Sequence, residues 1–234
     1  IVPASDTGAV EMAMWSLLGE RGVDSFAWEA FGKSWLTDAV SQLKLADLRV
    51  FEAEYGQLPD LHQYDNSRDC IFTWNGTAAG VRVPDASWIS PQREGLVIAD
   101  STSAVFAMEM PFDRLDVVTF SWQKALGGEG GHGVIILSPR AVERLENFTP
   151  PWPLPKIFRL TKKGAFASAV FDGDTINTPS MLCVEDAIDA LEWAVEIGGR
   201  EALFDRVDRN LAVVRDWLDG HPDFAFLADD PATI

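Results

Sequence analysis

Lys124 is the residue whose type and position most directly suggest chemistry. It lies in the segment SWQKALGG (residues 121–128), after an apolar run and before a glycine-rich turn. A lysine held among apolar neighbours can lose its proton and become a nucleophile, as Schiff-base chemistry requires. Taken alone, Lys124 is more simply explained as an ordinary solvent-exposed lysine.

Asp100 supplies a second group for the same chemistry. It ends the apolar run 96–100 and lies about one strand–loop–strand unit before Lys124. Pyridoxal phosphate enzymes need a lysine for the cofactor's aldehyde and a carboxylate that keeps its ring nitrogen protonated. Asp100 would equally suit a helix N-cap, because three hydroxyl residues follow it. The pair therefore supports the catalytic and the structural interpretation about equally.

The residues Ser5, Asp6 and Thr7 lie at the expected start of a helix, before a glycine. Backbone N–H groups at a helix start are unpaired and attract anions, so this segment predicts a phosphate site. The same residues would also make an ordinary N-cap. Trp28 lies just past the strand expected at 23–27 and could stack on a flat cofactor, although most tryptophans are core residues.

The segment GEGGHG (residues 128–133) matches the spacing of a dinucleotide-binding fingerprint. A true fingerprint directly follows a strand and opens a helix. Here the segment leads into the apolar run 134–137, which predicts a strand, so we do not expect a nicotinamide site. His132 within it is more readily a structural residue than an acid or base.

The elements that must position these residues follow from hydrophobic spacing. Helices are predicted at 6–18, 29–43, 182–198 and 201–218, and strands at 23–27, 48–51, 70–74, 96–100, 116–121 and 134–137. Strands that are apolar throughout indicate a mostly parallel sheet buried on both faces, in an α/β fold with flanking helices. Ligands bind such sheets at the carboxyl ends of the strands, so Asn75, Asp100, Gln123 and Lys124 are expected on one rim.

Composition excludes several classes of protein. The 234 residues are 47% apolar and 24% charged, which is typical of a globular chain and not of a disordered one. The formal net charge of −17 disfavours nucleic-acid and membrane-surface partners. No apolar run approaches the roughly 18 residues of a membrane span. Cys70 and Cys183 are too few for a disulfide framework or a structural zinc site, and they favour a cytoplasmic protein.

The domain organisation follows from proline content and the placement of the helices. The stretch TPPWPLP (residues 149–155) is too rich in proline for a helix or a central strand and predicts an extended excursion over 149–180. We expect a cofactor-binding large domain at 1–200. Residues 201–234 would form a linking helix and the start of a small α/β domain, with a strand near 224–227. The chain begins at Ile1 without a secretory pattern, and we expect its true N-terminus to be missing.

Six segments together resemble the phosphoserine aminotransferases, homodimeric pyridoxal-phosphate enzymes of the fold-type-I, class-V aminotransferase group. In the order found in that family, they are Ser5–Ala9, Trp28, Asn75–Thr77, Ala99–Ser103, Ser121–Lys124 and Asn177–Pro179. The resemblance implies a fold-type-I large domain and pyridoxal 5′-phosphate as cofactor. It further implies amino transfer between L-glutamate and 3-phosphohydroxypyruvate, giving O-phospho-L-serine and 2-oxoglutarate in serine biosynthesis.

The resemblance also implies a role for each matching residue. Lys124 would form the Schiff base and carry the proton, Asp100 would face the ring nitrogen, and Trp28 would stack on the ring. Thr77 would hydrogen-bond the ring hydroxyl. Residues implied at the phosphate are Ser5, Asp6, Thr7 and Gln123, with Asn177 and Thr178 reaching the cofactor of the partner subunit. The site would then be complete only in the homodimer.

Other functions stay open from the sequence. In this family the arginines that bind substrate lie largely outside the segments matched here, so another class-V enzyme such as an alanine– or serine–glyoxylate aminotransferase remains an alternative. A cysteine desulfurase fits poorly, because Cys70 is expected in a strand and Cys183 at a helix start. A catalytically inactive fragment is a further alternative.

Overall fold

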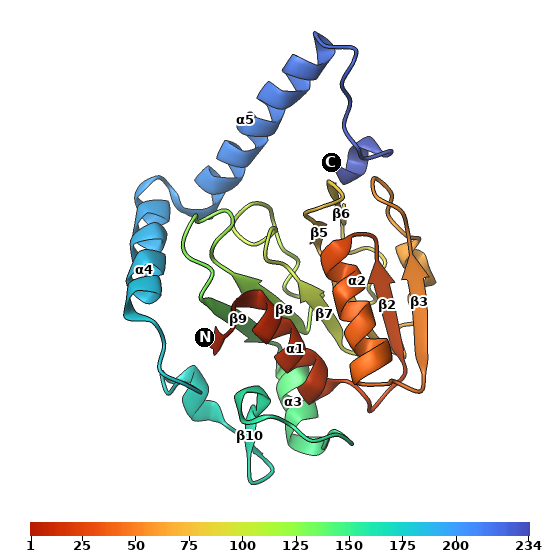
Figure 1. Ribbon diagram of the computed structural model, residues 1–234, viewed down its shortest axis with the longest axis vertical. Coiled ribbons are helices and arrows are strands. Elements are labelled where there is room, and N and C mark those ends of the chain that lie inside the picture. The colour runs from red at the N-terminus through yellow and green to blue at the C-terminus, as the bar shows by residue number, and fades with distance from the viewer.

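A seven-stranded sheet forms the centre of the computed structural model, which describes residues 1–234 (Figure 1). Its strands are β1 (Val2–Pro3), β2 (Val23–Ala27), β3 (Leu48–Glu52), β4 (Asp69–Thr73), β7 (Val97–Asp100), β8 (Val117–Ser121) and β9 (His132–Leu137). In space they run β1-β9-β8-β7-β4-β2-β3. The five strands from β3 to β8 are parallel, whereas β9 and β1 pair antiparallel. The predicted mostly parallel sheet is therefore confirmed.

The helices are α1 (Ser5–Leu17), α2 (Ala30–Thr37), α3 (Pro139–Asn147), α4 (Met181–Glu196) and α5 (Gly199–Asp219). A π-helical turn, Asp38–Gln42, continues α2, so the single helix predicted at 29–43 is two segments. Short 3-10 helices lie at Leu61–Gln63, Lys156–Phe158, Ser168–Phe171 and Pro231–Thr233. Two small hairpins pair β5 (Asn75–Gly76) with β6 (Val81–Arg82) and β10 (Thr161–Lys162) with β11 (Ala165–Phe166).

The two faces of the sheet are covered in different ways. Alternate residues along each strand point to opposite faces. Ile71 and Ile98 belong to a core shared with residues of α1, α2 and α3, whereas Phe72 and Ala99 belong to a second core. That second core is closed by residues of the loops, including Tyr64, Trp88, Ile89 and Val105. Every residue of β2, β4, β7 and β8 is buried, and most residues of these strands are apolar.

Close packing of β1, α1 and β9 fixes the start of α1. A Cβ at Gly8 would lie 2.0 Å from the Pro3 carbonyl oxygen, and one at Gly133 would lie 2.2 Å from the Ser5 carbonyl oxygen. Neither position tolerates a side chain without moving backbone. The N-terminal residues of α1 are consequently held against the end of β9 nearest to the loop after β8.

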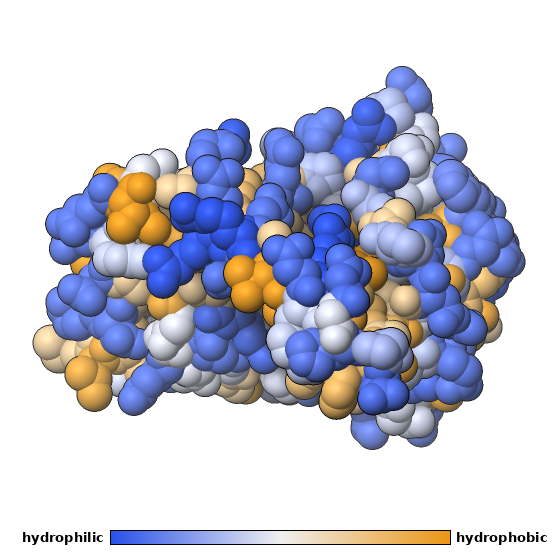
Figure 2. Space-filling model, turned by 90° about the horizontal axis from the view of Figure 1, so that it is seen from above, coloured by the Kyte–Doolittle hydropathy of each residue, from blue (hydrophilic) through white to orange (hydrophobic).

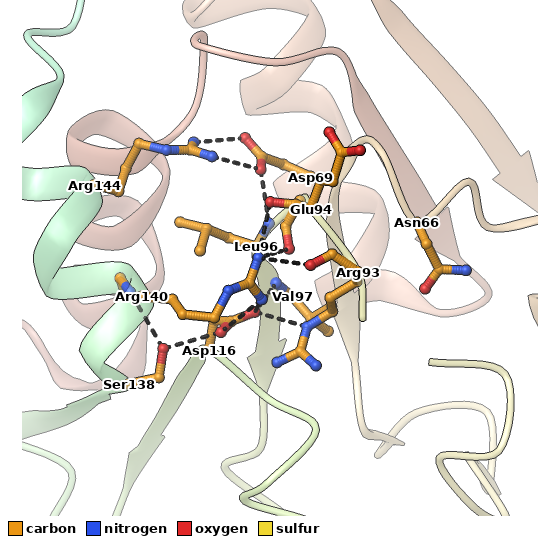
Figure 3. Close-up of polar contacts among 12 residues, drawn as sticks. Asn66, Asp69, Arg93, Glu94, Leu96, Val97, Asp116, Ser138, Arg140 and Arg144 are labelled. Carbon is orange, nitrogen blue, oxygen red and sulfur yellow. Dashed lines mark hydrogen bonds and ion pairs between the residues drawn. The ribbon is translucent and has the colours of Figure 1, made fainter. Parts of the chain in front are cut away.

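Ion pairs stabilise the opposite end of the sheet, where the parallel strands begin (Figure 3). Arg144 of α3 donates to both carboxylate oxygens of Asp69, at 2.9 and 3.2 Å, and also pairs with Glu20. Asp116 accepts from Arg93 at 3.0 Å and from Arg140 at 3.1 Å. The charges buried at this end are thus paired.

The C-terminal third departs from the sheet. Helix α4 packs against Trp122 through Cys183 and Ala187, and α5 then extends away from the main body (Figure 1). The chain turns between the two helices at Gly198 and Gly199, which have φ of 116° and 73°. The final residues return to the main body, where the Asp229 N–H donates to the Gly56 carbonyl oxygen at 2.8 Å. No helix is both long and apolar enough to cross a membrane.

One predicted element is wrong. The segment 224–227 is a loop and not a strand, because no neighbouring strand is present to pair with it. Phe224 instead packs against Trp217 of α5, with ring centroids 5.1 Å apart. By contrast, 149–155 has no regular secondary structure, as its prolines predict, and Trp152 packs at the edge of the core.

The face shown in Figure 2 is mostly hydrophilic, and its apolar residues form separate patches.

Candidate active site

A pocket lies at the carboxyl ends of β4, β7 and β8, beside the start of α1. It has an empty volume of about 460 Å³ and is lined by Ser5, Asp6, Thr7, Phe31, Trp35, Thr73, Thr77, Asp100, Thr102, Ser103, Gln123 and Lys124. Seven of the ten residues singled out from the sequence therefore line this pocket. As expected for a parallel sheet, the chemistry-bearing side chains meet at one rim.

The start of α1 has the geometry of an anion-binding cradle. Ala4 and Ser5 adopt left-handed φ angles of 67° and 57°, an uncommon conformation for residues other than glycine, and no side chain caps the helix. Gln123 Nε2 donates to Ser5 Oγ at 3.4 Å, and Ser5 Oγ donates to Ser121 Oγ at 3.0 Å. Such a turn at a helix N-terminus directs backbone N–H groups toward an anion, and strain of this kind is typical of functional sites.

Asp100 is held in a fixed orientation by two donors. Trp35 Nε1 donates to Asp100 Oδ2 at 3.0 Å, and the Thr102 backbone N–H donates to Oδ1 at 3.2 Å. The residue is only 5% exposed. Hydrogen bonds to both oxygens fix the orientation of this carboxyl group at the pocket.

Asp6 is the second buried carboxyl group of the pocket. It is 7% exposed and lies beside Asp100, Thr102 and Thr119. Burial, followed by the nearby Asp100 charge, raises the pKa of Asp6 well above its usual value. Two carboxyl groups this close resist carrying two negative charges.

Several buried polar atoms around the pocket have no hydrogen-bond partner. They are Asp6 Oδ1, Thr73 Oγ1, Thr102 Oγ1, Gln123 Oε1 and, beneath the pocket, Thr119 Oγ1. Folded proteins pair the great majority of such atoms. Thr102 and Thr119 lie beside Asp6, whereas Thr73 Oγ1 and Gln123 Oε1 are left for a polar ligand. Together with the anion cradle, a lysine and a fixed carboxyl group, these atoms fit pyridoxal phosphate.

Lys124 reaches the pocket from the loop after β8. Its side chain is exposed and makes no hydrogen bond or ion pair, so the amine is free to react. The loop is closed by a bond from the Gly127 N–H to the Lys124 carbonyl oxygen at 3.0 Å, with Gly127 at a φ of 76° that glycine adopts readily.

Thr77 is anchored by Ser103, a residue that sequence reasoning did not assign to the site. Thr77 Oγ1 donates to Ser103 Oγ at 2.8 Å, and Ser103 Oγ donates to the Asn75 carbonyl oxygen at 3.0 Å. The matched segments around Asn75 and Asp100 are therefore hydrogen-bonded to each other at the pocket.

The structure places three of the expected site residues elsewhere. Trp28 is only 1% exposed and donates from Nε1 to the Val81 carbonyl oxygen at 3.1 Å, within the second core. Phe31, one helical turn later and 48% exposed, is the accessible aromatic ring at the pocket. Asn177 and Thr178 are exposed in the segment before α4 and do not line the pocket.

Sequence reasoning also missed Trp35 and Thr73. Thr73 ends β4, so the position of a polar residue at a strand end was a usable signal. Trp35 carried no such signal, since only the folded chain brings α2 against the end of β7. His132 is structural in the described geometry: it is 6% exposed and accepts from the Ser180 N–H at 2.8 Å.

A larger hollow of about 990 Å³ lies between residues 56–62, 84–88 and 229–233. Its lining contains four aspartates, Asp60, Asp85, Asp229 and Asp230, and no lysine or arginine. An anionic substrate or cofactor would be repelled there. The smaller pocket with Lys124 is accordingly the candidate active site.

Comparison with known proteins agrees with this assignment. The chain is 58% identical over 229 residues to a phosphoserine aminotransferase of Methanosarcina barkeri and 59% identical to one of Methanosarcina mazei, covering 98% of this chain and 62% of each relative. A phosphoserine aminotransferase of Nocardioides is 23% identical over 227 residues. No model of a known protein family matches.

Solved structures share the fold. A phosphoserine aminotransferase of Cytophaga hutchinsonii superimposes with a TM-score of 0.82 at 19% identity, covering 98% of this chain and 64% of the other. That of Bacillus circulans gives a TM-score of 0.74 at 20% identity, covering 93% and 58%. A pyridoxamine–pyruvate aminotransferase of Mesorhizobium loti gives 0.73 at 19% identity, covering 88% and 54%.

The chain spans about 62% of the length of its curated Methanosarcina relatives. The chain thus has the fold of the fold-type-I aminotransferases, and its resemblance to the phosphoserine aminotransferases is confirmed over nearly its whole length.

Proposed function

We propose that this protein is a pyridoxal 5′-phosphate-dependent aminotransferase that acts on L-glutamate and 3-phosphohydroxypyruvate and gives O-phospho-L-serine and 2-oxoglutarate. The observation that carries the proposal is the meeting of Lys124, Asp100 and an anion cradle in one pocket, in a chain 58–59% identical to proteins named phosphoserine aminotransferase. Related solved structures are described as PLP-bound. This reaction would place the protein in serine biosynthesis.

The pocket offers a binding group for each part of the cofactor. The backbone at the start of α1, with Ser5, Thr7 and Gln123, would hold the phosphate. Thr77 would bond the ring hydroxyl from its position on Ser103. Asp6, for which the resemblance also implies phosphate contact, is buried beside Asp100.

Asp100 and Phe31 would fix the ring. Bound pyridoxal phosphate supplies an aldehyde that bonds to amines and a ring that accepts electrons when a Cα–H bond breaks. Asp100, oriented by Trp35, would hold the proton on the ring nitrogen. Phe31 is placed to cover the ring, the role that the resemblance gives to Trp28, whose side chain lies in the core.

Lys124 would do two jobs in sequence. With the cofactor bound, its unpaired amine would be the nucleophile that holds the aldehyde. When not so bonded, the same amine would serve as a base that accepts a proton from the substrate Cα and gives it back. Because no arginine lines the pocket, Lys124 is its one basic side chain.

We further propose a cytoplasmic homodimer in which each active site uses residues of both subunits. The exposed positions of Asn177 and Thr178, outside their own subunit's pocket, support an action on the partner's cofactor. Two free, buried cysteines support a reducing compartment. In this assembly residues 1–200 would bind the cofactor, and residues 201–234 would link it to a smaller domain.

The test is a two-step spectroscopic assay. The protein is loaded with pyridoxal phosphate and mixed with L-glutamate, which should convert the cofactor to its amino form and shift its absorption to shorter wavelength. Added 3-phosphohydroxypyruvate should then restore the original band and release phosphoserine. A protein that binds the cofactor but gives no change with glutamate would contradict aminotransfer and indicate an inactive fragment.

The other candidate is a glyoxylate-using aminotransferase of the same fold. A ureidoglycine–glyoxylate aminotransferase of Bacillus subtilis superimposes with a TM-score of 0.71 at 17% identity, covering 88% of this chain and 54% of the other, and the pocket itself contains no arginine for a substrate phosphate. Glyoxylate in the second step discriminates between the two. Restoration of the band by glyoxylate and not by 3-phosphohydroxypyruvate would replace the first proposal with this one.

A further inference from the structure

Asp6 presents a chemical problem at the place where a phosphate would bind. It lies in the first turn of α1, next to Ser5 and Thr7, and a charged carboxylate there would repel an incoming phosphate. Its side chain is 93% buried, and its Oδ1 atom has no partner. A charged carboxylate buried with only neutral hydroxyls and a second carboxyl group beside it is costly, which favours a protonated Asp6.

The neighbours of Asp6 decide which carboxyl group keeps a proton. Asp100 accepts two N–H donors, one from Trp35 Nε1 and one from the Thr102 backbone. Asp6 accepts no N–H donor, and beside it lie the hydroxyls of Thr102 and Thr119 and the carboxyl group of Asp100. Of two adjacent carboxyl groups that share a buried site, the one with the weaker donors retains the proton.

We propose that Asp6 is a positioning residue that acts through Asp100: its carboxyl group keeps a proton, donates it in a hydrogen bond to the Asp100 carboxylate, and leaves the pair with a single negative charge. One charge matches the single positive charge of a protonated ring nitrogen. The neutral Asp6 also leaves the adjacent cradle able to accept phosphate. This inference rests on the proposed cofactor, but the proton on Asp6 belongs to the protein alone.

Few other titratable groups face Asp6. Asp100 acts on it from β7, and Thr102 and Thr119 approach it with neutral hydroxyls. Lys124 lines the same pocket from the loop after β8, and His132 lies on β9 where that strand meets Ser5. The positive charges of α3 are at the opposite end of the sheet, paired with Asp69 and Asp116.

The state of Asp6 can be read from the pH dependence of stability. Its usual value in an unfolded chain is 3.8, and burial beside Asp100 raises the pKa in the folded protein. Between those two values only the folded state holds the proton, so wild-type stability falls as pH rises through this window. Asp6→Asn keeps the shape of the side chain and a hydrogen-bond donor but cannot ionise. The stability of this variant should therefore not fall as pH rises through the window.

The experiment compares thermal unfolding of the wild type and Asp6→Asn without cofactor across this pH range. The melting temperature of Asp6→Asn minus that of the wild type should grow by at least about 3 °C between about pH 4 and about pH 8. Asp113→Asn changes an exposed aspartate outside the pocket and serves as the control. The melting temperature of this variant minus that of the wild type should not grow by this amount over the same pH range. In an Asp100→Asn background the pH-dependent difference should shrink, because one cause of the retained proton is gone. A difference independent of pH would overturn the proposal.

Cofactor affinity supplies the second readout. As Asp6 ionises at high pH, the dissociation constant of pyridoxal phosphate for the wild type should rise relative to that for Asp6→Asn, by about tenfold for one unit of coupling. A constant ratio across pH would contradict the link to the cofactor. If the wild type binds no cofactor at any pH, the proposed function fails, while the unfolding data still decide whether Asp6 keeps its proton.

Discussion

At the scale of single residues, the amine of Lys124 and the carboxyl group of Asp100 line one pocket at the end of the sheet. Lys124 is unpaired and Asp100 is doubly hydrogen-bonded, so one is free to react and the other is held still. This contrast separates the pocket from the ion-pair clusters at the other end of the sheet, where every charge has a partner and none is free for chemistry.

Replacing Lys124 tests the nucleophile. Lys124→Ala should lower the rate of amino transfer by at least about 10³-fold, because both the covalent link to the cofactor and the proton carrier are lost. Single-turnover kinetics with glutamate measure the loss. Lys162→Ala, at an exposed lysine of the β10–β11 hairpin, is the matched control and should react at the wild-type rate. Equal rates for both variants would remove Lys124 from the mechanism.

Replacing Trp35 tests the orientation of Asp100. Trp35→Phe keeps most of the packing but removes the donor to Asp100 Oδ2. Hydrogen bonds to charged groups contribute about 1.5–3 kcal/mol, so cofactor affinity should fall about tenfold or more. A titration followed by tryptophan fluorescence or visible absorption measures it. Trp152→Phe removes an indole donor outside the pocket and serves as the control; a similar loss of affinity in both would show that only packing matters.

At the scale of elements, rigid packing at both ends of the sheet supports the site. Gly8 and Gly133 let α1 lie against β9, which sets the position of the anion cradle. The clusters around Asp69 and Asp116 tie α3 and the loop before β7 to the ends where the strands begin. Binding and stability are therefore located at opposite ends of the same strands.

The Arg144–Asp69 pair makes this separation measurable. Arg144→Met leaves Asp69 buried without its ion-pair partner, and breaking such a pair costs about 3–5 kcal/mol of unfolding free energy. Arg21→Met disrupts the exposed pair with Glu94 and should change stability by less than about 1 kcal/mol. Denaturant unfolding gives both values. Equal, small losses would show that the buried pair contributes no more than the exposed one.

The sequence predicts these elements to different degrees. The strand at 23–27 is recovered residue by residue and the one at 48–51 to within one residue, although β2 contains Asp24 and Ser25 and β3 is largely exposed. The rim containing Asp100 and Lys124 follows from strand direction alone. Helix α3 was not predicted, because its sequence is short and rich in charged residues, as in a loop. In the structure Ser138 caps its first turn. Trp35 could not be assigned, because its contact with Asp100 depends on how α2 packs.

At the scale of the whole molecule, α4 and α5 carry unpartnered apolar residues. Met181, Leu182 and Val195 of α4 are 79%, 70% and 74% exposed, although such residues are usually buried. Exposed apolar surface of this kind marks an interaction site, and the segment with Asn177 and Thr178 leads directly into it. The proposed homodimer would cover it.

A mixture of two inactive variants tests whether active sites are shared. If Asn177 acts on the partner's cofactor, mixed dimers of Lys124→Ala and Asn177→Ala contain one intact site and should recover activity that neither variant has alone. If Asn177 acts within its own subunit, mixing restores nothing. Sedimentation of Leu182→Asp, which places a charge on the apolar face of α4, should show a shift toward monomer.

The most direct test of the central claim is identification of the residue that bonds the cofactor. The protein is incubated with pyridoxal phosphate, reduced with borohydride to fix the bond, digested and mapped by mass spectrometry. We predict that the label is found on Lys124. A label on another lysine, or a folded protein that retains no cofactor, would contradict the assignment of this pocket as the active site.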